Sequence, residues 1–305
     1  MNTFFATLPI FLIIAAGYIL TRNRIAENRW VNPLNNFVYF IALPALIILS
    51  LMKLDLSTSS LQLTLLASTV ISLIAALLFA GISVCLPFPT KTRVTIFLTA
   101  ILGNSIFLGI PLAQVMTPDI SKEVITTVSV VFFTTALVSS LIIIEIWLRK
   151  SRGGGHIAES LIKNPIIVAL AVGLILAIIP IPKTAADFIA TPLQLLAQTA
   201  SPLALFALGG FLTRHRFTRS HWLSITIASG LKLTVLPLFF IALLGLTTLD
   251  GASIELQTLL AATPTAVTAF VLTEKYKLSS ELAGAVMLTS TVISVVSIPL
   301  LMQIS

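Results

Sequence analysis

Charged residues are scarce in this sequence. Only 10% of its 305 residues are Asp, Glu, Lys or Arg, whereas a soluble globular domain carries about 25%. So few charges cannot cover a water-facing surface of this size, and 57% of the residues are hydrophobic. The composition therefore excludes an ordinary soluble protein and predicts an integral membrane protein with lipid as its main solvent.

The residue patterns of membrane enzymes are also missing. The single cysteine, Cys85, excludes an internal disulfide and any multi-cysteine metal site. The sequence has no His-Glu-x-x-His motif, and its apolar runs contain no Asp. Apart from Glu281, the first residue of the last run, their one acidic residue is Glu145. Metalloproteases, aspartyl proteases and prenyl transferases need such groups. We therefore expect no enzymatic activity, no cofactor and no metal site.

Apolar runs long enough to cross a bilayer fill most of the chain. Short polar breaks separate ten of them, at 4–21, 35–52, 61–86, 94–116, 124–148, 164–181, 188–212, 222–245, 256–273 and 281–303. Backbone groups must be hydrogen-bonded internally in lipid, so each run should be a helix. The alternating pattern of membrane barrel strands is absent. We expect an all-α membrane protein with ten transmembrane helices.

Basic residues alternate between the loops, which predicts an orientation. Of 18 Lys and Arg, 14 fall in odd-numbered loops and three in even-numbered loops. Positive loops stay in the cytoplasm, so both termini should lie outside a plasma membrane (the inner membrane in a bacterium). No basic residue precedes the first run, so we expect a span there rather than a signal peptide. The net charge of +7 thus reflects topology and not a nucleic-acid partner.

The two halves of the chain resemble each other. Pro9 and Gly17 in the first span match Pro165 and Gly173 in the sixth, both at an offset of 156. Further matches are Pro44 with Pro202, and Pro111 with Pro264. Each half has five spans, an odd number, so the second repeat should be inverted in the membrane, as in many secondary transporters. Similarity of composition alone is the plainer alternative.

This repeat divides the chain into three parts. The first five-helix repeat covers residues 1–148, and a short cytoplasmic linker covers 149–163. The second repeat covers 164–305.

Spans four and nine contain residues that interrupt helices, together with polar side chains. Proline removes a backbone donor, and glycine weakens a helix further. A helix broken at mid-membrane exposes N–H groups that favour an anion. The alternative is a proline kink packed against its neighbours. The candidate substrate-binding residues in these two spans are Asn104, Ser105, Gly109, Pro111, Thr263, Pro264 and Thr265.

Lys232 is the one basic residue deep within a predicted span. It lies ten residues from Trp222, so roughly 15 Å into the membrane at 1.5 Å per residue. A charge at that depth is expensive and functional by default. Lys232 is therefore a further candidate, either attracting an anion or replacing a cation during transport. Pairing with carbonyl groups freed by a broken helix is the equally weighted alternative.

Several of these motifs resemble the auxin efflux carrier family, which includes plant auxin exporters and bacterial permeases described as malonate or malate carriers. The matching motifs are Leu-Pro44-Ala-Leu, Gly-Asn104-Ser-Ile-Phe-Leu-Gly-Ile-Pro111, Asn164-Pro165-Ile-Ile, Ser201-Pro202-Leu-Ala-Leu, Leu-Lys232-Leu-Thr-Val-Leu-Pro237 and Ala-Thr-Pro264-Thr-Ala-Val. They extend over nearly the whole chain. The sequence lacks the long cytoplasmic loop of the plant proteins after span five and the charged residues of their auxiliary site in span three.

The resemblance implies a fold related to the bile acid–sodium symporters. Spans 1, 2, 6 and 7 would form a scaffold that also dimerises, and spans 3–5 and 8–10 a transport domain. Spans four and nine would cross as broken helices, with a substrate carboxylate near Asn104 and the prolines. We expect a membrane-embedded homodimer that carries a small organic anion by elevator-like alternating access. A sodium-coupled symporter is the alternative, and a channel is a third option.

Overall fold

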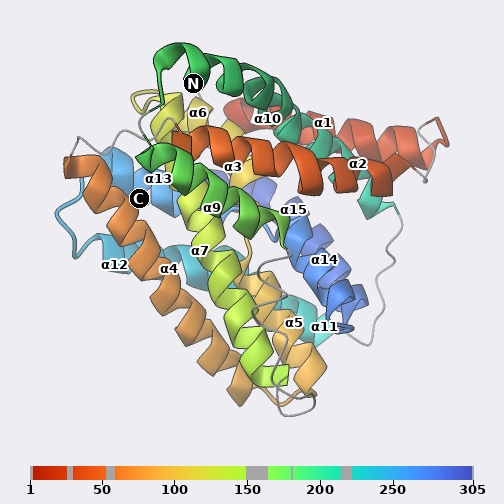
Figure 1. The fold of residues 1–305 in the computed structure, drawn as a ribbon. Coiled ribbons are helices and arrows are strands. Elements are labelled where there is room, and N and C mark those ends of the chain that lie inside the picture. The colour runs from red at the N-terminus through yellow and green to blue at the C-terminus, as the bar shows by residue number, and fades with distance from the viewer. Residues whose placement is uncertain are drawn as a thin grey trace.

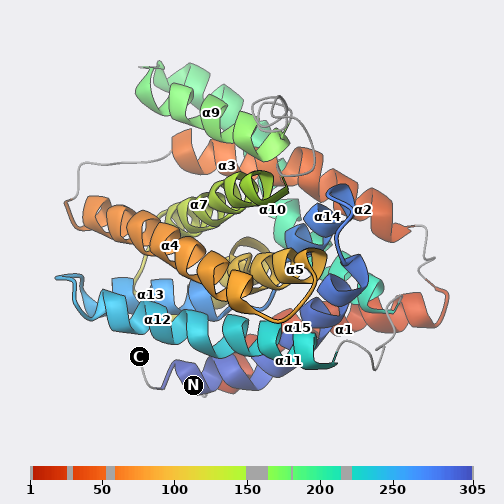
Figure 2. The ribbon, with the colours of Figure 1, turned by 90° about the horizontal axis from the view of Figure 1, so that it is seen from below.

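A computed structural model describes residues 3–25, 30–52, 59–148, 164–179, 181–213 and 222–303. These ranges are helical, with one isolated β-bridge and no strand among them. Figures 1 and 2 show the helices crossing in several layers. The all-α prediction is confirmed for this part of the chain, and the predicted linker at 149–163 lies outside the described residues.

A helix, whole or in pieces, lies at each predicted span. The bounds are α1 Thr3–Arg22; α2 Val31–Phe37, η2 Val38–Ala42 and α3 Leu43–Met52; α4 Ser59–Cys85; α5 Thr90–Ile101, η3 Ser105–Gly109 and α6 Ile110–Met116; α7 Lys122–Leu148; α9 Pro165–Ile178; α10 Lys183–Leu212; α11 Trp222–Gly230, η6 Leu231–Val235 and α12 Leu236–Leu244; α13 Gly251–Ala262 and α14 Val267–Lys275; and α15 Ser280–Leu301. Six of these helices are long and apolar enough to cross a membrane. This supports a multi-pass membrane protein, while the count of ten stays a prediction.

Three helices widen into a π-helical turn just before a proline. The turns η2, η3 and η6 each end two residues before a proline, namely Pro44, Pro111 and Pro237. A proline within a helix has no N–H and clashes with the preceding turn, and a π-turn accommodates such a residue without ending the helix. The prolines therefore widen these helices and leave them continuous from the π-turn onward.

Glycines bring two helix pairs into close contact. A Cβ on Gly17 of α1 would collide with the Phe206 carbonyl of α10. A Cβ on Gly209 of α10 would likewise collide with the backbone of α1 at Ile14. A Cβ on Gly173 of α9 would lie 2.8 Å from Leu51 Cδ1 of α3. Small residues that let helices approach closely are the usual packing device in membranes. The glycines thus fix the α1–α10 and α3–α9 contacts.

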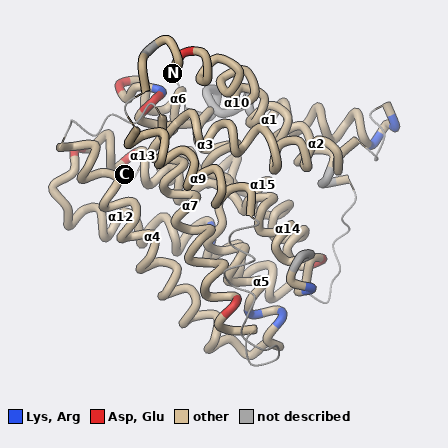
Figure 3. The backbone as a smooth tube through the Cα atoms, in the orientation of Figure 1, with Lys and Arg blue, Asp and Glu red and all other residues tan. Residues whose placement is uncertain are grey.

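Charged groups gather at two ends of the molecule (Figure 3). Arg22 ends α1 and Arg24 follows it, Lys91 and Arg93 lie in the first turn of α5, and Lys277 lies between α14 and α15. The opposite end carries most of the described acidic residues, Asp119, Glu123, Asp187, Asp250 and Glu255, together with Lys122. The middle of the structure is almost free of charge.

Candidate functional site at the helix crossing

Two interrupted helices contact each other at their interruptions. One interruption covers 102–104, between α5 and η3, and the other covers 263–266, between α13 and α14. The extended segments pair across the gap in a single antiparallel bridge between Gly103 and Thr265. The amide of Asn104 donates to the Pro264 carbonyl at 2.7 Å, and the amide of Ala266 donates to the Leu102 carbonyl at 2.8 Å. The predicted breaks therefore exist and lie in contact.

Side chains bond several other backbone groups at the interruptions. The Thr265 hydroxyl donates to the Thr99 carbonyl at 2.7 Å, and the Thr265 amide donates to Ser290 Oγ at 3.1 Å. The Thr263 hydroxyl donates to the Leu260 carbonyl at 2.7 Å. Buried polar groups without partners destabilise a fold. These bonds are what allows unwound backbone to persist inside the protein.

Lys232 reaches the same crossing from η6. Its side chain is fully buried, and Nζ donates to the Ala261 carbonyl at 2.9 Å. A Cβ added to Gly103 would lie 2.7 Å from Lys232 Nζ and 2.7 Å from Thr263 Oγ1. The ammonium group therefore lies beside both interruptions. This is the pairing with a freed carbonyl, one of the two predictions for Lys232, and it brings the side-chain nitrogen to the crossing.

The helix that begins after the first interruption starts with unpaired donors. The Asn104 carbonyl accepts from the amides of Leu108 and Gly109, at 3.1 and 3.0 Å. The preceding amides, of Ser105, Ile106 and Phe107, form the first turn and have no intrahelical acceptor. No side chain caps this helix start. Within the described chain the buried Ser105 hydroxyl also has no partner, so the turn presents several donors to an anion.

Gly109 and Pro111, the two remaining candidates in span four, have different surroundings. A Cβ on Gly109 would lie 2.9 Å from Leu260 Cδ2 and 3.3 Å from Thr263 Cγ2, so this glycine lets η3 approach α13. Pro111 is the second residue of α6, seven residues beyond Asn104, and does not interrupt the helix. It lines a neighbouring cavity instead. Pro264, by contrast, lies within its interruption.

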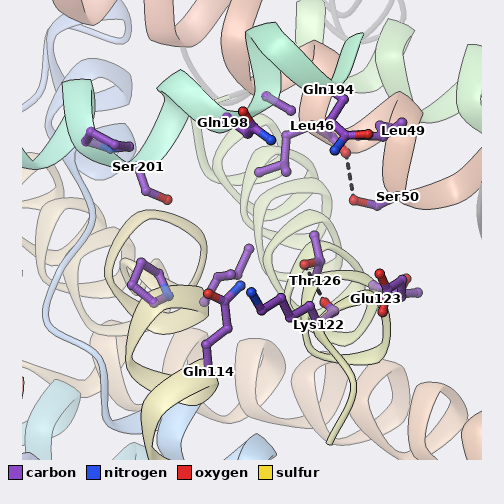
Figure 4. Close-up of a pocket in the computed structure, with 15 residues that line it drawn as sticks. Leu46, Leu49, Ser50, Gln114, Lys122, Glu123, Thr126, Gln194, Gln198 and Ser201 are labelled. Carbon is purple, nitrogen blue, oxygen red and sulfur yellow. Dashed lines mark hydrogen bonds between the residues drawn. The ribbon is translucent and has the colours of Figure 1, made fainter. Parts of the chain in front are cut away.

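Two cavities flank the crossing. The larger, of about 420 Å³, lies between α3, α6, α7 and α10 (Figure 4). The smaller, of about 30 Å³, lies beside Phe107 of η3 and Val267 of α14 and has room for one or two waters. Neither cavity is lined by Asn104 or Thr263, both of which are buried. In this conformation the predicted site is closed.

Apart from Pro111, the residues that line the larger cavity were not predicted from the sequence. Gln194 and Gln198 are polar residues four apart within a predicted span, so they share one helix face, and this signal was available. Gln114 and Lys122 reach the same cavity from α6 and α7. Their proximity to α10 depends on packing between distant segments, which periodicity does not reveal.

Comparison with known proteins identifies the family of this chain. A family model described as "Membrane transport protein" matches residues 3–160 and 154–302. The chain therefore belongs to this family, that of the auxin efflux carriers. It is similar to an "Uncharacterized transporter" of Methanothermobacter thermautotrophicus, with 27% identity over 96% of this chain and 95% of the relative. It is also similar to the "Uncharacterized transporter YfdV" of Escherichia coli K12, with 24% identity over 100% and 99% of the two chains.

Proposed function

We propose that this protein is a secondary transporter that moves a small organic anion across a cell membrane. The observation that carries the proposal is the contact between two interrupted helices, with Lys232 Nζ bonded to one freed carbonyl. Helix N-termini and unwound backbone meeting inside a membrane protein are the usual substrate site of secondary transporters. The unpaired first-turn amides and the buried ammonium both favour a carboxylate.

The packing supports ten spans arranged as two inverted repeats. Gly17 brings span one against span seven, and its sequence match Gly173 brings span six against span two. Span one corresponds to span six, and span seven corresponds to span two, so the two contacts are equivalent in the two repeats. The two interruptions are equivalent in the same way, since they lie in spans four and nine. Matched glycines in matched contacts argue against chance resemblance between apolar helices.

Movement of one helix group against another would open the closed site. The helices α1, α2–α3, α9 and α10 contact one another, as do α4, α5, α7, α11, α14 and α15. The first group would be the scaffold and the second would belong to the transport domain. The 420 Å³ cavity lies between the groups, because α3 and α10 form one wall and α6 and α7 the other. Elevator-like displacement along this boundary would expose the crossing to each side in turn.

Orientation and assembly follow from charge and apolar surface. The basic end of the molecule (Figure 3) would face the cytoplasm, and both termini would then lie outside the plasma membrane. The α9 helix exposes Val172, Ile175 and Ile178, and lipid or a second copy in a homodimer would cover them.

Lys232 favours transport without sodium. Its ammonium already bonds the carbonyl of Ala261 at the end of α13, where a sodium ion would otherwise find oxygen ligands. A sodium-coupled symporter is the second candidate, because hydroxyl and carbonyl oxygens are abundant at the crossing. Uptake into proteoliposomes with and without a sodium gradient separates the two. Sodium-independent uptake supports the first, and strict dependence supports the second.

A binding screen with an Asn104 variant tests the assigned site. A ligand that binds only the folded state raises the melting temperature, so purified protein is screened against mono- and dicarboxylates. The best carboxylate should fail to stabilise Asn104→Ala, while the unliganded variant melts close to the wild type. Asn104 contributes its backbone amide to the contact between the interruptions, and its side chain takes no part in that bond. The variant should therefore still fold. Equal stabilisation of both proteins refutes the assignment.

A further inference from the structure

The larger cavity collects polar groups that the helix crossing does not use. Lys122 and Gln114 reach it from α7 and α6, and Gln194, Gln198 and Ser201 reach it from α10. Figure 4 shows these side chains directed toward one another across the gap between the two helix groups. Its volume of about 420 Å³ lies within the range of small-molecule sites, about 300–1,000 Å³. The cavity is therefore large enough for a small organic solute.

Lys122 is the only cation among the described residues that line this cavity. No ion pair or side-chain hydrogen bond engages its ammonium within the described chain, and the same holds for the carboxamides of Gln114, Gln194 and Gln198. Figure 4 shows the Lys122 side chain extending toward Gln114, whereas Glu123 lies on the other side of the same turn. The cavity thus presents one unpaired ammonium beside three carboxamides, and the Glu123 carboxylate also lines it.

The lining also restricts the kind of solute. Among the described lining residues none is aromatic, and the apolar contacts come from small or aliphatic side chains such as Leu46, Ile110 and Pro111. An aromatic acid would find no ring to stack on. A short carboxylate with further oxygen atoms would instead pair with Lys122 and accept hydrogen bonds from the glutamines.

We propose that this cavity is a loading site for a short, non-aromatic carboxylate, separate from the helix crossing, with Lys122 as the residue that recognises the anion. The proposal rests on the proposed transport function, because Pro111 connects the cavity with the helix that starts at the crossing. The anion binds here first, between the two helix groups, and moves inward when they shift. Residues from both groups contact it, so its binding responds to their relative position.

Protection of an introduced cysteine tests the site directly. Cys85 is exposed and is the single cysteine, so Cys85→Ser gives a background without thiols. In that background Gln198→Cys is labelled with a maleimide in the presence of malonate, succinate or malate. At least one acid should slow labelling several-fold, and its neutral diamide should not. If none of the three acids protects the cysteine, the loading site is wrong.

Charge variants identify the recognition residue. In Lys122→Gln the acid concentration that protects the cysteine should rise about tenfold or more, the scale of a lost charge-assisted bond. Lys122→Arg should restore most of the lost affinity. Lys91→Gln removes a lysine at the opposite, basic end and should change nothing, whereas Glu123→Gln should tighten binding. Equal protection in Lys122→Gln and wild type contradicts the assignment to Lys122.

The same assay separates this proposal from the transport site. Protection should persist in Asn104→Ala, because Asn104 does not line the cavity. Loss of protection in Asn104→Ala would mean a single site at the crossing and would overturn the loading site. Persistent protection together with unimpaired transport by Asn104→Ala would leave the loading site in place and refute the crossing as the transport site.

Discussion

Gly103→Ala is the substitution that the crossing should tolerate least. The new Cβ would lie 2.7 Å from both Lys232 Nζ and Thr263 Oγ1 and 3.2 Å from Lys232 Cε. The lysine is fully buried and has to move, which breaks its bond to the Ala261 carbonyl. Overpacking costs about 1–3 kcal/mol, and a hydrogen bond to a charged group contributes about 1.5–3 kcal/mol. Together these two terms predict destabilisation of about 2.5–6 kcal/mol.

A glycine elsewhere in the protein provides the matched control. A Cβ on Gly81 of α4 would meet nothing within 4 Å, and alanine is the better helix former by about 1 kcal/mol. Gly81→Ala should therefore be neutral or slightly stabilising. Unfolding of purified protein in mixed detergent and denaturant, followed by tryptophan fluorescence, measures both variants. If Gly103→Ala unfolds like Gly81→Ala, the close packing at the crossing is wrong.

Three further substitutions test other parts of the account. Lys232→Gln should slow anion transport or change its voltage dependence, measured as current across proteoliposome membranes; unchanged rates and voltage dependence would leave the lysine a purely structural role. Thr265→Val removes a hydroxyl that satisfies a buried carbonyl and should cost about 1–3 kcal/mol, while the exposed control Thr191→Val should stay within about 0.5 kcal/mol. Gly173→Val should destabilise the α3–α9 contact by about 1–3 kcal/mol, and an effect no larger than that of Gly81→Val would contradict the packing argument.

The sequence predicts the interruptions well because their causes are local. Gly103 and Pro264 disfavour a helix in their own segments, and polar neighbours such as Asn104 and Thr265 make sense at mid-membrane only beside partners. Pro111 shows the limit of this reasoning. A proline near a helix start is tolerated through a π-turn, and whether it breaks or widens the helix depends on what bonds the freed carbonyl groups.

Other features required the three-dimensional packing. The count of residues from Trp222 predicts Lys232 at mid-membrane, but its contact with the Ala261 carbonyl joins residues 29 apart. The Ser290 hydroxyl that accepts from the Thr265 amide comes from a third helix. The cavity of Lys122 and Gln198 combines four helices. In each case the partner lies far away in the sequence, and one sequence without aligned relatives carries no signal of such pairs.

The central claim is that first-turn amides at the crossing hold the carboxylate of a transported anion. Solid-state NMR measures this directly, as dipolar coupling between a ¹³C-labelled carboxylate and the ¹⁵N amides of Ser105, Ile106 and Phe107 in protein saturated with the best ligand of the binding screen. An N–H···O bond of about 2.9 Å predicts strong coupling at roughly 4 Å or less to at least one of these amides, and its loss in Asn104→Ala. Coupling to none of the three, with the ligand bound, would contradict the account.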